Sequence, residues 1–88
     1  MPYIHESRRG KLDLYLTMID EACTDVGSYV YCMTRIATML GRPGQWEELS
    51  FRRLNEAIGA LECTKLEFYR RMVAPYEDKR CEENGDVF

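Results

Sequence analysis

The first half of the chain carries apolar residues at the roughly 3.6-residue spacing of helices. The first stripe consists of Leu12, Leu16, Ile19 and Cys23, and the second of Tyr29, Met33, Ile36 and Leu40. They predict one helix from about Ser7 or Lys11 to Thr24 and another from about Ser28 to Leu40. Gly27 is the expected breaker between them, and Gly-Arg-Pro-Gly at 41–44 is the expected stop. We expect the two helices to pack as a hairpin.

The second half predicts one long helix. Ser50 is a suitable N-cap, and no proline interrupts the following residues up to Val73. The apolar stripe of this helix is formed by Leu54, Ile58, Leu61, Phe68 and Met72. Pro75 should kink or break the helix, and a further helical segment should follow until Gly85, where glycine suits the position beyond a helix end.

These patterns predict the fold class. The chain shows no strand-like alternation and no internal repeat, so residues 1–88 should form a single all-α domain. We expect a small antiparallel helical bundle with one long C-terminal helix that is kinked or broken near Pro75. Because that helix is about twice as long as its partners, part of its apolar surface stays uncovered. The chain should therefore assemble as a homo-oligomer.

Lys65 interrupts the apolar stripe of the long helix. Helix positions separated by about 100° place it near the middle of that stripe. A lysine there must extend its ammonium group to solvent or find an anionic partner, since an unpaired buried charge is strongly destabilising. Glu62, three residues earlier, is the nearest candidate. One interpretation is therefore a Glu62–Lys65 pair that sets the register between helices or chains.

The other interpretation is a binding site for a phosphate-bearing ligand. Lysine and arginine suit phosphate oxygens, and tyrosine rings can stack on a base. The ligand-binding residues predicted in this way are Glu62, Lys65, Tyr69, Arg70, Arg71 and Tyr76. Taken alone, such a mixture of charges is also typical of a solvated helix surface.

Charge and composition narrow the possible functions. Twelve lysines and arginines stand against fifteen acidic residues, which gives a formal net charge of -3. Non-specific DNA binding requires a strongly cationic surface and is therefore not expected. No apolar run approaches the roughly 20 residues of a membrane span. We expect a soluble, cytoplasmic protein.

Residues suited to catalysis or metal binding are few. The four cysteines lack Cys-x-x-Cys spacing, and the single histidine, His5, lies near the N-terminus. No glycine-rich phosphate loop is present, and a nucleophilic enzyme would need a positioned base. We expect no metal, no cofactor and no enzyme activity. Metal-dependent hydrolysis at Glu62 and Glu67 is the remaining alternative.

The second half of the chain resembles a small family of phage and bacterial proteins of unknown function, whose members open with Met-Pro-Tyr-Ile as this chain does. Helix composition alone would not produce such a mixture of glycine, proline, tyrosine and charges. Residues 37–51 match the family pattern poorly. The matching segments are Leu-Asn-Glu-Ala-Ile-Gly-Ala-Leu-Glu-Cys-Thr-Lys-Leu-Glu-Phe-Tyr-Arg-Arg at 54–71, Ala-Pro-Tyr-Glu-Asp-Lys at 74–79 and Asn-Gly-Asp-Val at 84–87.

The resemblance implies a phage or prophage origin and action by binding. Some phage proteins are oligomeric sponges that sequester the cyclic nucleotides with which bacterial CBASS defence signals infection. The chain looks like such an anti-CBASS sponge, with a cyclic oligonucleotide held in pockets of a homo-oligomer in the host-cell cytoplasm. The alternative is a helical protein–protein interaction module of phage or prophage origin without a small-molecule ligand.

Overall fold

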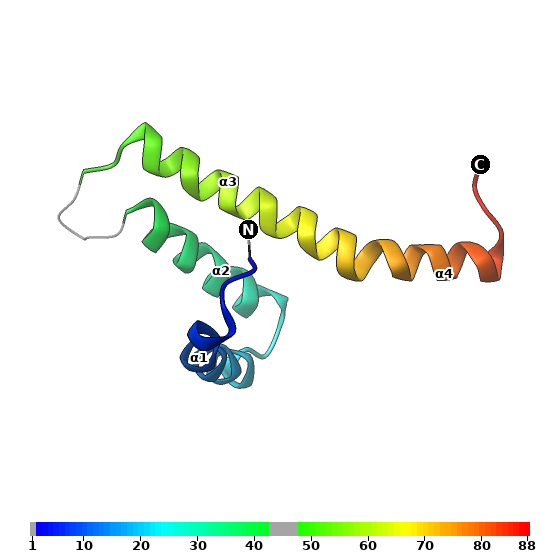
Figure 1. Cartoon of the computed structure of the whole chain (residues 1–88), viewed down its shortest axis with the longest axis horizontal. Coiled ribbons are helices and arrows are strands. Elements are labelled where there is room, and N and C mark those ends of the chain that lie inside the picture. The colour runs from blue at the N-terminus through cyan, green and yellow to red at the C-terminus, as the bar shows by residue number, and fades with distance from the viewer. Residues whose placement is uncertain (1, 43–47) are drawn as a thin grey trace.

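The computed structural model describes residues 2–42 and 48–88, and this part of the chain is helical almost throughout (Figure 1). It contains no strand, so the all-α prediction is confirmed. The last three elements run on from one another as a single long rod. In chain order the elements are the 3₁₀ turn η1 (Glu6–Arg8), α1 (Arg9–Ala22), α2 (Val26–Gly41), α3 (Phe51–Phe68), the π-helical turn η2 (Tyr69–Val73) and α4 (Ala74–Asn84).

A side-chain cap sets the start of α2. Asp25 Oδ1 accepts hydrogen bonds from the Ser28 backbone N–H at 2.7 Å and from the Ser28 hydroxyl at 2.6 Å. These bonds hold the pKa of Asp25 below its usual range because they stabilise the ionised carboxylate. The helix therefore begins at Val26, before the predicted start at Ser28. Gly27 lies inside its first turn, so the prediction that Gly27 breaks the chain was wrong.

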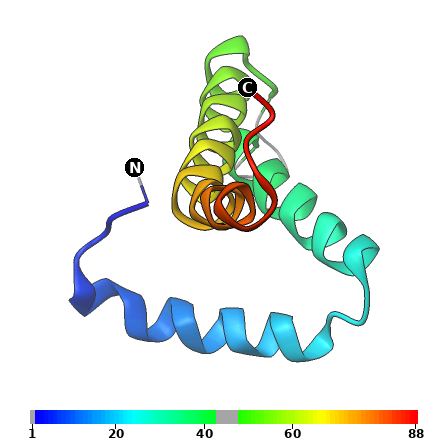
Figure 2. The ribbon, with the colours of Figure 1, turned by 90° about the vertical axis from the view of Figure 1, so that its right-hand side faces the viewer.

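The first two helices do not form the predicted hairpin. They meet at a corner, where Cys23 Sγ lies 4.0 Å from Cys32 Sγ and the Tyr29 hydroxyl donates to Asp20. Beyond this corner α1 and α2 diverge (Figure 2), and α1 makes its main contacts with η1. The helical pattern of α1 was predicted correctly, but an apolar stripe does not specify which helix covers it.

The hairpin that does form joins α2 and α3, which pack side by side. Their apolar side chains line an open cavity of about 180 Å³. α2 ends at Gly41, which is buried, while Pro43 and Gly44 of the predicted stop lie outside the described residues. The cavity is lined by Met33, Ile36, Ala37 and Leu40 of α2 and by Ala57, Ala60, Leu61 and Thr64 of α3.

Pro75 widens the long helix instead of ending it. Proline has no N–H to donate and its ring crowds the carbonyl four residues earlier. The chain accommodates it through the π turn, in which the Ala74 N–H bonds to the Tyr69 carbonyl, five residues back. The rod changes direction at this turn, between α3 and α4 (Figure 1). A kink near Pro75 is therefore what the structure shows, and a break is not.

The two ends of the rod are capped as predicted. At the start, the Ser50 hydroxyl accepts a hydrogen bond from the Arg53 N–H at 3.2 Å. At the end, Gly85 has a φ of +88°, in the region that favours glycine, and its N–H bonds to the Cys81 carbonyl at 2.8 Å. Helix α4 therefore stops at Asn84.

The core of a single chain is confined to the α2–α3 hairpin. Ala57 is the only buried apolar side chain in the described part of the chain. Large apolar residues on every helix remain at least two-fifths exposed, among them Leu16 of α1, Met33 of α2 and Phe68 of α3. None of the described helices is long and apolar enough to cross a membrane.

We expect Gly41→Leu to separate α2 from α3 and Gly41→Ala to be tolerated. A Cβ atom at position 41 would lie 3.5 Å from Leu54 Cδ2 and 3.6 Å from Ala57 Cβ, which are ordinary contact distances. A larger side chain would overpack this approach, at a typical cost of about 1–3 kcal/mol. Urea unfolding followed by circular dichroism should give a lower midpoint for the leucine variant. Equal midpoints would contradict a close approach at Gly41.

Candidate functional site

The six predicted ligand-binding residues lie along the middle of the rod, on both sides of the kink. The π turn holds three of them, and such turns inside helices are frequent at functional sites. The backbone irregularity and the predicted site therefore coincide. Glu62 and Lys65 belong to α3, Tyr69, Arg70 and Arg71 to η2, and Tyr76 to α4.

Lys65 pairs with Glu62 on the exposed side of α3. The Lys65 Nζ atom lies 3.2 Å from Glu62 Oε1, and the two side chains are 70% and 54% exposed. The α2–α3 cavity is lined by Ala57, Leu61 and Thr64, so α2 packs to one side of the predicted stripe and does not cover Lys65. An ion pair this exposed contributes at most about 1 kcal/mol to stability.

A polar network ties the N-terminal segment to the rod. The Arg70 guanidinium donates two hydrogen bonds to the Glu67 carboxylate, from Nη2 to Oε1 at 2.9 Å and from Nε to Oε2 at 3.3 Å. The Tyr3 hydroxyl donates to Glu67 and accepts from Arg70 Nη2 at 3.1 Å. Glu67 is the most enclosed of the three, with a side chain only 24% exposed. This Tyr3–Glu67–Arg70 network brings the start of the chain against the middle of the rod (Figures 1 and 2).

Tyr3 and Glu67 were not among the predicted ligand-binding residues, and Glu67 was considered only for the alternative of metal-dependent hydrolysis. Their sequence positions are 64 residues apart, and nothing in the helical pattern connects them. The one signal was the Met-Pro-Tyr-Ile opening shared with the resembled family, which places a tyrosine at this position. In the structure, this tyrosine attaches the N-terminal segment to the rod.

Tyr69 is held across the kink. Its hydroxyl donates to Glu77, with distances of 3.0 Å to Oε1 and 3.2 Å to Oε2. This hydrogen bond and the charge of Glu77 raise the pKa of Tyr69, because ionising the phenol would place a second negative charge beside the carboxylate. The bond links η2 to α4, while about half of the tyrosine side chain remains exposed.

The predicted cations do not converge in a single chain. Successive helix residues are rotated by about 100°, so Lys65 and Tyr69 share one side of the rod. At the same rotation, Arg70 and Arg71 lie roughly 140° and 120° from Lys65 in opposite directions around the axis, and the π turn alters these angles. Arg71 and Tyr76 make no hydrogen bond or ion pair within the described residues. One chain therefore directs its cations to different sides of the rod and does not gather them in one pocket.

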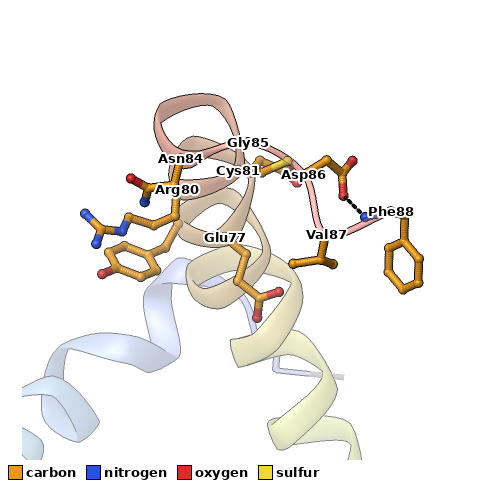
Figure 3. A pocket seen from close by; sticks show the side chains of 10 residues that line it. Glu77, Arg80, Cys81, Asn84, Gly85, Asp86, Val87 and Phe88 are labelled. Atoms are coloured by element: carbon orange, nitrogen blue, oxygen red, sulfur yellow. Dashed lines mark hydrogen bonds between the residues drawn. The ribbon is translucent and has the colours of Figure 1, made fainter.

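An open groove of about 530 Å³ lies between α4 and the C-terminal tail (Figure 3). Of the predicted ligand-binding residues, only Tyr76 lines it, beside Glu77 and Arg80. The tail turns back at Gly85, and Asp86 accepts a hydrogen bond from the Phe88 N–H at 3.0 Å. The Phe88 side chain is fully exposed and points away from the helix in Figure 3.

Groups suited to metal binding or nucleophilic catalysis are dispersed. The described residues contain no cluster of three or more histidines, cysteines, aspartates or glutamates. All four cysteines are free, and Cys63 is exposed. Partial burial and the hydrogen bond to Cys32 raise the pKa of the Cys23 thiol, which disfavours its reactive thiolate form.

The geometry defines a class of protein: a small all-α chain whose polar cluster lies on an exposed, kinked helix. Within that class, the chain belongs to a family described as a domain of unknown function, DUF6899, whose model matches residues 1–87. The predicted resemblance to a family of unknown function is thereby confirmed. No curated protein and no solved structure matches the chain.

We expect Tyr3→Phe to release the N-terminal segment while leaving the rod intact. The substitution removes the hydroxyl that bridges Glu67 and Arg70 and retains the ring. Amide hydrogen exchange of residues 2–8 should become faster, whereas exchange in α3 should be unchanged. Tyr31→Phe, which alters an exposed tyrosine of α2, is the matched control. Unchanged protection of residues 2–8 would argue against the tether.

Glu77→Gln should lower the pH at which Tyr69 ionises. The native carboxylate raises the pKa of Tyr69 above its ordinary value of 10.0. The stability that the Tyr69–Glu77 hydrogen bond contributes is therefore complete below that pH and is lost as the pH rises through the raised pKa. Removing the charge should reverse this shift. Ultraviolet absorbance of tyrosinate, titrated in the native protein and the variant, measures the difference. Superimposable titration curves would show that Glu77 does not act on Tyr69.

Proposed function

We propose that this chain is a non-enzymatic binding protein that works as a homo-oligomer and sequesters a cyclic oligonucleotide immune signal. The observation that carries the proposal is the grouping of exposed cations and tyrosine rings around the π turn. Lys65 and Arg71 offer positive charge, and Tyr69 and Tyr76 offer rings that are 49% and 63% exposed. These groups suit a ligand that combines phosphates with bases.

The chemistry of capture requires no turnover. Lys65 and Arg71 would contact phosphate oxygens, and the tyrosine rings would stack on bases. A sponge at equimolar concentration lowers the free signal effectively when its dissociation constant is nanomolar, equivalent to about 12 kcal/mol of binding free energy. The resemblance to phage proteins supports this role, with the host-cell cytoplasm as the place of action.

An assembly of copies is part of the proposal because the cations of one chain lie on different sides of the rod. Within the chain, Lys65 and Arg70 are also paired with Glu62 and Glu67. A site with net positive charge would therefore combine cations from neighbouring copies. The homo-oligomer would create a pocket that a single rod does not provide.

A second candidate is a helical protein–protein interaction module without a small-molecule ligand. The observation that favours it is the same pairing: Glu62 and Glu67 already neutralise two of the predicted phosphate-binding cations. In this function the ion pairs would set the orientation of a partner helix, and the exposed apolar residues would provide the contact area.

Binding of labelled cyclic di- and trinucleotides to the pure protein tests the first candidate. We expect a mobility shift at micromolar protein, and we expect Arg71→Ala or Lys65→Ala to weaken binding at least about tenfold, the loss of one charge-assisted contact. Arg35→Ala, which removes an exposed arginine of α2, should bind like the native protein. No shift with any cyclic nucleotide would overturn the sponge proposal.

The behaviour of Lys65→Ala separates the two candidates. A ligand-binding lysine should leave the mass of the assembly and its melting temperature unchanged while ligand binding weakens. A lysine that orients helices should instead lower the melting temperature or dissociate the assembly. Mass spectrometry of ligand recovered after denaturation tests the non-enzymatic claim, since cleaved nucleotide would identify a hydrolase.

A further inference from the structure

A single chain exposes far more surface than a folded monomer of its size. Its accessible surface is 8197 Å², whereas a monomer of 10.4 kDa is expected to expose about 5,400 Å². The radius of gyration is 16.9 Å, compared with about 12 Å for a compact chain of this length. Covering this excess of about 2,800 Å² on each of two chains would bury about 5,600 Å² in total, the scale of a large obligate interface between subunits.

Part of this excess is an uncovered apolar stripe on α1, which we call the α1 face: Leu12, Tyr15, Leu16 and Ile19. Leu12, Tyr15 and Leu16 are each about half exposed. The Asp25 cap turns α2 away from α1, and the Tyr3–Glu67–Arg70 network connects α1 to the rod only through the N-terminal segment. In Figure 2, α1 runs separately from the other helices. In its own chain the α1 face is bordered by the N-terminal segment, where Pro2, Tyr3 and Ile4 line an open groove with Leu12 and Leu16. The face is therefore only partly covered.

A second uncovered stripe, the rod face, consists of Ile58, Phe68 and Met72. Their side chains are 65%, 59% and 61% exposed, and none of them lines the pocket between α2 and α3. Lys65 lies between Ile58 and Phe68 on the same side of the helix. The rod face is thus apolar, with the Glu62–Lys65 ion pair beside its middle.

We infer that the two faces cover each other between copies: the α1 face of one chain packs on the rod face of a second, and reciprocally. This inference rests on the homo-oligomer of the proposed function and specifies its interface. Every chain carries one face of each kind, so a two-fold pair covers all four faces at once.

Charged substitutions with a matched control test this interface. Leu16→Arg places a cation in the α1 face, and Leu14→Arg places one on roughly the opposite side of the same helix. Leu16 and Leu14 are 54% and 59% exposed, so exposure does not distinguish them. Light scattering should give the native mass for Leu14→Arg and the mass of one chain for Leu16→Arg. Phe68→Glu in the rod face should also give single chains.

Mixing the two dissociated variants tests whether the faces exchange between copies. An equimolar mixture of Leu16→Arg and Phe68→Glu would contain one native contact and one arginine–glutamate contact per pair, and we expect the assembly to re-form. Circular dichroism should show any helix lost in the separate variants returning in the mixture. That recovery would show that neither substitution prevents folding.

The remaining outcomes overturn the inference in distinguishable ways. A native assembly that survives Leu16→Arg and Phe68→Glu would refute this interface but leave the proposed homo-oligomer standing. Equal dissociation by Leu14→Arg and Leu16→Arg, or a mixture that stays dissociated, would also refute it. A native chain that is helical and monomeric at micromolar concentration would refute the interface together with the homo-oligomer. It would then assign the exposed faces to a different protein.

Discussion

The packing of α2 against α3 is the interaction on which the rest of this structure depends. It contains the only buried apolar side chain of the described residues, Ala57, and Gly41 allows the two helices to approach closely at its end. α1 and α4 contribute little to that core and are connected to it through a capped corner and a kinked helix. A fold with so small a core has modest stability as a single chain, because buried apolar area is the main favourable term.

Pro75 connects this framework to the candidate site. The π turn that accommodates the proline contains Tyr69, Arg70 and Arg71, and it alters how their side chains are distributed around the rod. Tyr69 then reaches Glu77 on α4, and Arg70 holds Glu67 on α3. A hydrogen bond therefore links the turn to α4 and an ion pair links it to α3, with the N-terminal tyrosine bound to that ion pair. The polar cluster and the accommodation of the proline thus share one short segment of the rod.

The apolar faces and the polar cluster favour a function that requires more than one chain. Lys65 belongs to both features, since it lies within an uncovered apolar stripe and pairs with Glu62 at the surface. Much of this could be predicted from the sequence, including the unusual position of Lys65 and its partner. The Tyr3–Glu67–Arg70 network could not be predicted as a whole, because Tyr3 is 64 residues from Glu67 and 67 from Arg70 and no periodicity relates it to them.

The sequence by itself determined the helices, because caps, glycines and apolar spacing act over a few residues. Ser50, Pro75 and Gly85 marked a cap, a kink and an end correctly. The tertiary structure decided which helices pair. The prediction that α1 packs on α2 was wrong, since the Asp25 cap turns the chain and α2 finds its partner in α3. Apolar stripes are interchangeable in chemistry, and the choice between them depends on the angle of each connection and on close approaches such as that of Gly41.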